Sequence, residues 1–270
     1  TLSNFFFLKI FKKKSKNVIL ISEKGNNPIF LLSKKMKLFH VESKKFIGGR
    51  YSVLSEVGLL PAYIMGLNIS NLRKNLLVHF EKKNSNFLKE SSILLANLIN
   101  KNKFNDLILI NYVPELESFL FWYQQLFAES LGKNKKGFLP LVSNTPKDHH
   151  SLMQLYLDGP KNKTFYIFST IQKKNMKINS EHLDIKLSYL KNKSLSQIKN
   201  AQKNAFIKIL KKRKIPFREF VIRDFDEKTL GELFSYFMLE TAMIGKLLSI
   251  NPYDQPAVEE VKMFTRRFLI

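Results

Sequence analysis

The sequence contains no cysteine, only one tryptophan, 10 glycines and 9 prolines in 270 residues. The absence of cysteine excludes disulfide scaffolds, thiolate zinc sites and cysteine nucleophiles. Apolar runs are short compared with the roughly 18–20 residues that a membrane-spanning helix needs, and there is no signal-peptide pattern. We therefore expect a soluble, cytoplasmic protein without a membrane partner.

Acidic residues are scarce: 22 Asp and Glu stand against 45 Lys and Arg, a formal net charge of +23. Such a charge is compatible with binding to nucleic acid or to an anionic membrane. The lysines are spread along the whole chain, however, and the aromatic residues occur in apolar runs that are typical of a core. We therefore expect no nucleic-acid partner and interpret the charge as a property of the overall composition.

Hydrophobic residues make up 44% of the chain, which is enough for a full core. Their periodicity alternates between short β-branched runs and helical stripes. The predicted strands are Asn17–Ile21, Lys37–Val41, Asp106–Val113, Phe138–Val142, Thr164–Ile171 and Pro216–Ile222. The predicted helices are Val53–Met65, Asn71–Phe80, Phe87–Asn100, Pro114–Leu131, Asp148–Leu157, Leu195–Leu210, Leu230–Leu248 and a segment after Pro252. This alternation predicts an α/β fold with parallel sheets covered on both faces, which bind ligands beyond the carboxyl ends of their strands.

A pair of glycines precedes an arginine between the second predicted strand and the first predicted helix. Gly48 and Gly49 permit positive φ and close backbone approach, and Arg50 follows them directly. At a helix entrance, where free amide groups favour anions, Arg50 is a candidate anion-binding residue. The alternative is a tight turn with a solvated arginine, and spacing alone does not separate the two.

Two polar side chains lie four residues apart in the predicted helix after Pro114. Gln125 and Glu129 therefore project from one face of that helix. An amide beside a carboxylate can hydrogen-bond a polyol and move a proton, which makes Glu129 a candidate general base or acid. The alternative is an exposed polar stripe, although Glu129 follows the strongly aromatic stretch Phe119–Phe127.

Two adjacent histidines follow Asp148, which we expect to be the N-cap of the next helix. Neighbouring helical positions point about 100° apart, so His149 and His150 make a poor metal pair. One imidazole can be catalytic while the other is structural.

A proline-rich turn near the C-terminus leads into the last predicted helix. Gln255 and Lys262 lie seven residues apart there, so they share one side of that helix if it begins early enough. A lysine at such a position is usually solvent-facing.

Together these segments resemble the glucose-6-phosphate isomerase family, of the shorter bacterial type. Three separated stretches match it in order, namely Gly48–Ser55, Gln125–Lys133 and Tyr253–Lys262. The pair His150-Ser151 falls between the second and third stretches, where the family carries its histidine. The similarity runs from near Thr1 to the C-terminus.

The resemblance implies an aldose–ketose isomerase that interconverts glucose 6-phosphate and fructose 6-phosphate through a cis-enediol, a step of glycolysis and gluconeogenesis. No metal or organic cofactor is implied. The alternative is a non-catalytic phosphosugar-binding module, because sugar-isomerase domains also serve as sensors.

The family's site residues carry over to matching positions of this sequence. By this resemblance, Glu129 shuttles a proton between C2 and C1 of the sugar, and Arg50 stabilises the enediolate. His150 assists ring opening with Lys262 as its partner at the ring oxygen. The residues that would hold the substrate near its phosphate are Gln125 and Gln255. The family's histidine reaches the site from the neighbouring subunit, which implies a homodimer.

The implied fold is α/β, with three-layer αβα sugar-isomerase domains, parallel sheets and C-terminal helices. We expect residues 1–66 to be the remainder of an incomplete first domain, 67–225 the second domain and 226–270 a C-terminal helical segment. The family's Ser/Thr-rich phosphate loop has no equivalent in the sequence. We therefore interpret the chain as the C-terminal portion of a longer enzyme, and we expect it to turn over little in isolation.

Overall fold

A computed structural model describes residues 17–171, 177 and 184–270. The chain forms two compact units, Thr1–Lys74 and Asn75–Ile270. The domain boundaries expected near residues 66 and 225 stay predictions. Among the residues described, no helix is long and apolar enough to cross a membrane.

The first unit contains a two-stranded parallel sheet. Strands β1 (Ile19–Ser22) and β2 (Phe39–Glu42) pair in register and are connected by helix α2 (Pro28–Lys35). The sequence analysis did not predict α2, although its start carries two helix signals: the Asn27 side chain accepts from the Phe30 amide at 2.8 Å, and a proline follows it. The remaining elements of this unit are the 3₁₀ helix η2 (Gly49–Leu54) and the helices α3 (Glu56–Ile64) and α4 (Ile69–Arg73).

One continuous helix over Asn71–Phe80 was predicted, and this is wrong. Helix α4 ends at Arg73, and the 3₁₀ helix η3 (Val78–Phe80) forms separately. Between them, the Asn75 side chain donates to Glu232 and the Leu76 carbonyl accepts from Ser235. The Leu76 carbonyl, which a continuous helix would pair locally, is thus satisfied by a distant helix, and the Asn75 side chain contacts the same helix, so tertiary contacts override the local pattern.

The second unit is organised around a four-stranded parallel sheet with the order β4-β3-β5-β6. Its strands are β3 (Asp106–Asn111), β4 (Leu139–Asn144), β5 (Lys163–Thr170) and β6 (Phe217–Ile222). Central strands β3 and β5 are buried along nearly their whole length, as expected of strands covered on both faces. Its remaining elements are η4 (Lys82–Asn84), α5 (Asn86–Asn100), η5 (Pro114–Leu116), α6 (Glu117–Leu131), α7 (Lys147–Asp158), η6 (Ile185–Leu190), α8 (Leu195–Lys212), α9 (Glu227–Leu247) and α10 (Pro256–Phe268).

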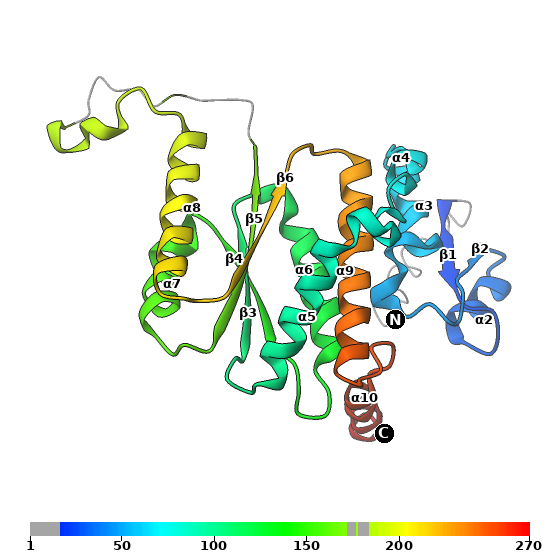
Figure 1. Ribbon diagram of the computed structural model, residues 1–270. Coiled ribbons are helices and arrows are strands. Elements are labelled where there is room, and N and C mark those ends of the chain that lie inside the picture. The colour runs from blue at the N-terminus through cyan, green and yellow to red at the C-terminus, as the bar shows by residue number, and fades with distance from the viewer. Residues whose placement is uncertain (1–16, 172–176, 178–183) are drawn as a thin grey trace. The chain divides into compact units, whose positions relative to one another are not determined.

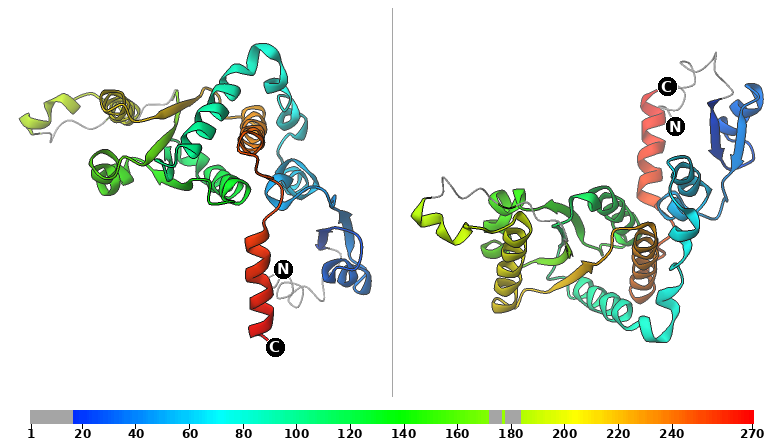
Figure 2. Two further views of the ribbon diagram at one scale, coloured as in Figure 1. Left: turned by 60° about the horizontal axis from the view of Figure 1, so that its bottom comes forward. Right: turned by 90° about the horizontal axis from the view of Figure 1, so that it is seen from above.

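Helices cover both faces of this sheet (Figures 1 and 2). On one face, Ile108 and Ile167 pack with side chains of α7 and α8, such as Tyr156 and Phe206. Helices α5, α6 and α9 lie on the other face, where α9 contacts both α5 and α6. The predicted α/β fold with three αβα layers is therefore confirmed for this unit.

The core between α5, α6, α9 and β5 contains a buried carboxyl group. Glu240 of α9 is fully buried and accepts hydrogen bonds from the hydroxyls of Tyr123 (3.0 Å), Tyr166 (2.9 Å) and Tyr236 (3.2 Å). The Ser91 hydroxyl lies 2.7 Å from that of Tyr166. Burial raises the pKa of Glu240, although the tyrosine and serine hydroxyls oppose that shift. The Glu240 carboxyl therefore links helix α9 to helix α6 and to strand β5.

Candidate active site

Glu129 lies in the last turn of α6, where the predicted pairing with Gln125 is present. The Gln125 amide Nε2 donates to Glu129 Oε1 at 3.0 Å, so the amide orients the carboxylate. The helix ends directly afterwards at Gly132, whose amide donates to the Ala128 carbonyl. A Cβ at position 132 would lie 2.7 Å from that carbonyl oxygen, so the close approach requires glycine.

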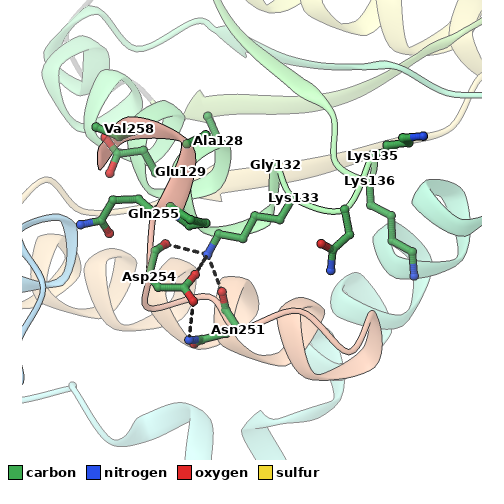
Figure 3. A pocket seen from close by; sticks show the side chains of 13 residues that line it. Ala128, Glu129, Gly132, Lys133, Lys135, Lys136, Asn251, Asp254, Gln255 and Val258 are labelled. Carbon is green, nitrogen blue, oxygen red and sulfur yellow. Dashed lines mark hydrogen bonds and ion pairs between the residues drawn. The ribbon is translucent and has the colours of Figure 1, made fainter. Parts of the chain in front are cut away.

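A pocket of about 730 Å³ opens beside Glu129 (Figure 3). This volume is within the range of small-molecule sites. Its walls come from the end of α6, the loop that follows it, and the segment that leads into α10. The lining residues are Ala128, Glu129, Gly132, Lys133, Asn134, Lys135, Lys136, Asn251, Asp254, Gln255, Pro256, Ala257 and Val258. The structure thus brings Glu129 and Gln255, 126 residues apart in the sequence, to one cavity.

The pocket lies at the amino edge of the sheet, not at the carboxyl edge where the sequence analysis expected ligands. Helix α6 follows β3 and α9 follows β6, so both helices run back across the sheet and end beside the amino ends of the strands. Figure 1 shows α10 below the lower end of α9, whereas the arrowhead of β6 points the other way. The carboxyl-edge rule concerns loops that follow strands, and this pocket is built from segments that follow helices.

Lys133 forms a contact in the pocket wall that the sequence analysis did not predict. Its ammonium donates to the carboxylate Oδ1 and the backbone carbonyl of Asp254, each at 2.6 Å, and also to the backbone carbonyl of Asn251 (Figure 3). The hydrogen bond from Lys133 lowers the pKa of Asp254. Both residues belong to matched stretches of the sequence, but no spacing rule pairs positions 121 residues apart.

Lys262 lies outside the pocket lining. It is on α10, two turns after Gln255, which is the N-cap of that helix. Its ammonium contacts Glu259 Oε1 at 2.7 Å, and both side chains are more than half exposed. An exposed pair of this kind contributes little stability, so Lys262 is available to a ligand.

Arg50 belongs to the first unit and is buried, with 5% of its surface exposed. It lies in η2, and its guanidinium is 5.6 Å from the Tyr51 ring. The alternative of a solvated arginine is therefore wrong. Neither glycine uses the positive φ that it permits: Gly48 has φ −63°, and Gly49 also lies outside the positive-φ region. The backbone instead enters a regular 3₁₀ turn.

The two histidines of α7 have different surroundings. His149 is half-buried against Phe206, and its Nε2 lies 2.7 Å from the Tyr112 hydroxyl, which fits a structural role. Burial lowers the pKa of His149. His150 is exposed. Asp148 was expected to be the N-cap, but it lies inside the first turn and its side chain accepts from the Asn144 amide.

Glu129 and His150 do not meet within one chain. Glu129 precedes β4 and lies at the amino edge of the sheet, whereas His150 follows β4 and lies at the carboxyl edge. Strand β4 has 6 residues, so its ends are about 20 Å apart at about 3.3 Å per residue.

Metal ligation is not indicated in the part of the chain that the structure describes, where no group of three or more His, Cys, Asp or Glu side chains is placed to hold an ion. The second unit is thus a layered parallel α/β unit whose pocket at the helix ends has the volume of a small-molecule site. Its carboxylate and amide groups suit a polyol.

Comparison with known proteins identifies the family to which the chain belongs. The sequence profile of the phosphoglucose isomerase family matches residues 30–269. The glucose-6-phosphate isomerase of Mycoplasmopsis pulmonis is 39% identical over 226 residues, which cover 80% of this chain and 52% of that protein. A crystal structure of a hypothetical protein from Thermus thermophilus superposes with a TM-score of 0.88 at 25% identity, over 99% of this chain and 68% of that one. A glucose-6-phosphate isomerase structure from Chlamydia trachomatis, with a TM-score of 0.77 at 16% identity, covers 98% of this chain and 55% of that one and has the same fold.

The chain belongs to the phosphoglucose isomerase family. It spans between 52% and 62% of the length of the curated relatives that it matches first.

Proposed function

We propose that the whole protein interconverts glucose 6-phosphate and fructose 6-phosphate, an aldose–ketose isomerisation through a cis-enediol in glycolysis and gluconeogenesis. The observation that carries this proposal is the Glu129 carboxylate at a sugar-sized pocket that also contains the Gln255 amide, in a chain of this family. The names of the matched relatives favour an isomerase over a non-catalytic phosphosugar-binding module.

Glu129 is the proposed proton-transfer base. Moving a proton between C2 and C1 of an open-chain sugar needs one carboxylate that reaches both carbons. The Gln125 amide donates to Glu129 Oε1 at 3.0 Å and so orients the carboxylate beside the pocket. In this proposal Gln255 also binds the sugar, and the assignment of Gln125 to substrate binding stays a prediction.

The remaining proposed roles belong to side chains that can carry a positive charge or transfer a proton. As the proton leaves C2, negative charge develops on the enediolate oxygens, and Arg50 is the cation proposed to stabilise it. His150 is proposed to assist ring opening with Lys262 as its partner at the ring oxygen, a step in which the ring oxygen gains a proton and the C1 hydroxyl loses one. None of these steps requires a metal or an organic cofactor.

A two-chain site is part of the proposal, because Glu129 and His150 lie at opposite edges of one sheet. In a symmetric dimer the same contact occurs twice: His150 of each subunit faces Glu129 of the other. We therefore propose a homodimer with two such sites.

The base assignment is tested by a coupled isomerase assay on the whole protein. We expect Glu129→Gln to lower kcat by roughly 10²–10⁴, the usual contribution of general acid–base catalysis. Glu260→Gln, which changes an exposed carboxylate of α10, is the matched control. A loss below about tenfold for Glu129→Gln contradicts the assignment.

The dimer is tested by mixing two inactive variants. Each heterodimer of Glu129→Gln with His150→Ala contains one doubly altered site and one intact site. Random reassembly then restores about a quarter of the wild-type activity, because half of the dimers are mixed. A mixture that stays as inactive as its components excludes a site shared between subunits.

A further inference from the structure

Lys133 is placed to hold the wall of the pocket that faces Glu129. An ammonium group has three protons and no acceptor. The described contacts of Lys133 use three acceptors: the carbonyls of Asn251 and Asp254 and the Asp254 carboxylate. Only 12% of the Lys133 side chain is exposed. All three protons of the Lys133 ammonium are therefore donated to groups of the protein, so we do not assign Lys133 to phosphate binding.

The segment that Lys133 holds is internally bonded. The Asn251 side chain donates to Asp254 Oδ2 at 2.9 Å and accepts from the Tyr253 amide at 3.1 Å. Pro252 packs close to Gly245, where an added Cβ would lie 3.1 Å from the proline ring. The turn from Asn251 to Asp254 is thus a small rigid unit, and one strong contact is sufficient to fix its position.

This turn leads directly to the residues that complete the pocket. Gln255 follows it, and α10 with Lys262 begins at the next residue. Lys133 in turn lies two residues after the end of α6, the helix that carries Glu129. The Lys133 ammonium therefore connects the end of α6, the helix that carries Glu129, to the turn that precedes Gln255 (Figure 3).

We propose that Lys133 is a positioning residue, whose ammonium fixes the Asn251–Gln255 turn so that Gln255 and the start of α10 face Glu129. The kinetic part of this inference rests on the proposed isomerase function. The structural part does not, because it concerns only how the turn is held.

The hydrogen bonds between Lys133 and the turn predict which substitutions preserve this contact. Lys133→Met keeps the length of the apolar stem and removes all three donors. Lys133→Arg keeps the charge, but a planar guanidinium does not direct three donors from one point, so we expect it not to restore the contact. Asp254→Asn keeps the backbone carbonyl and removes the charge, so we expect an intermediate effect.

The structural part is tested by hydrogen exchange of the full chain, followed by mass spectrometry of peptides. In Lys133→Met we expect peptides over residues 251–262 to exchange at least about tenfold faster, while those of β3 and β5 keep their wild-type rates, because local opening need not involve the core. Lys208→Met, at an exposed position of α8, is the matched control. Exchange of residues 251–262 within about threefold of wild type overturns the proposal.

The kinetic part is tested by separating kcat from KM. Loss of folded enzyme lowers the apparent kcat and leaves KM unchanged, whereas a displaced wall also weakens substrate binding. For Lys133→Met we expect kcat to fall by roughly 10–100-fold, as for a misplacement of about 1 Å, together with a rise in KM. An unchanged KM overturns the positioning role. If wild-type protein shows no isomerase activity at all, the proposed function fails, and the exchange experiment still decides how the turn is held.

Discussion

The buried carboxyl of Glu240 predicts an unusual dependence of stability on pH. Its pKa in the folded state is raised, and burial is the largest cause. A group of this kind binds its proton more tightly in the folded than in the unfolded chain. Its contribution to stability is therefore complete below the ordinary pKa of a glutamate and is lost as the pH rises through the folded-state pKa.

The expected size of the effect follows from linkage. While the native state holds one proton that the unfolded state has released, the free energy of unfolding falls by about 1.4 kcal/mol per pH unit. Glu240→Gln abolishes this slope, because an amide does not titrate. It also costs about 1–3 kcal/mol, because its NH₂ group cannot accept the bond that Tyr123 donates to Oε2; the Tyr123 hydroxyl must then accept from the amide, and its own proton loses its buried acceptor.

The measurement is urea unfolding of wild type and Glu240→Gln at several values between about pH 5 and 8. We expect the stability difference between wild type and variant to be largest at the acid end and to shrink as the pH rises. Glu260→Gln, on exposed α10, should keep the wild-type slope. Parallel curves for wild type and Glu240→Gln, at a constant separation, would refute the argument that the native state holds the extra proton.

Other contacts yield predictions that chemical unfolding and activity measurements can check. Tyr112→Phe removes the hydroxyl that lies 2.7 Å from His149 Nε2, and we expect a loss of about 1–2 kcal/mol in the free energy of unfolding; an unchanged midpoint would show that water replaces the hydroxyl. Gly245→Ala adds a Cβ 3.1 Å from Pro252, and we expect a loss of about 1–3 kcal/mol from overpacking. Because Pro252 belongs to the turn held by Lys133, Gly245→Ala should also speed exchange of residues 251–262, and normal exchange there would argue against a rigid turn. Leu120→Ala, at a fully buried position of α6, should cost about 2–5 kcal/mol, and a smaller loss would mean that the core collapses around the cavity.

Local patterns predicted most of the second unit, because its elements carry their own signals. The strand predicted at Asp106–Val113 and the helix predicted over Pro114–Leu131 both appear, with bounds within a few residues. The continuous apolar run of β3 and the glycine after α6 depend only on neighbouring residues. The same is true of the pairing of Gln125 with Glu129, which helical geometry fixes.

The features that the sequence analysis missed depend on distant residues. The helix predicted through Asn75 is broken because Asn75 and Leu76 bond to side chains of α9 more than 150 positions away. Lys133 and Asp254 pair across 121 positions. In a chain with 45 basic residues, composition gives no reason to select one lysine, so only the folded arrangement identifies it.

The position of the pocket explains why the site residues are scattered along the sequence. Loops after strands and loops after helices emerge at opposite edges of a parallel sheet. Glu129, Lys133 and Gln255 come from segments at or after the ends of helices and gather at one edge, whereas His150 follows β4 and lies at the other. If Glu129 and His150 act in one site, as proposed, a single chain does not bring them together, because strand β4 alone is about 20 Å long. A second subunit whose opposite edge approaches the pocket removes this conflict, and a twofold axis applies the solution to both subunits at once. The proposed dimer is an arrangement that brings the two edges together, because helix α6, which carries Glu129, runs antiparallel to strand β4, which precedes His150.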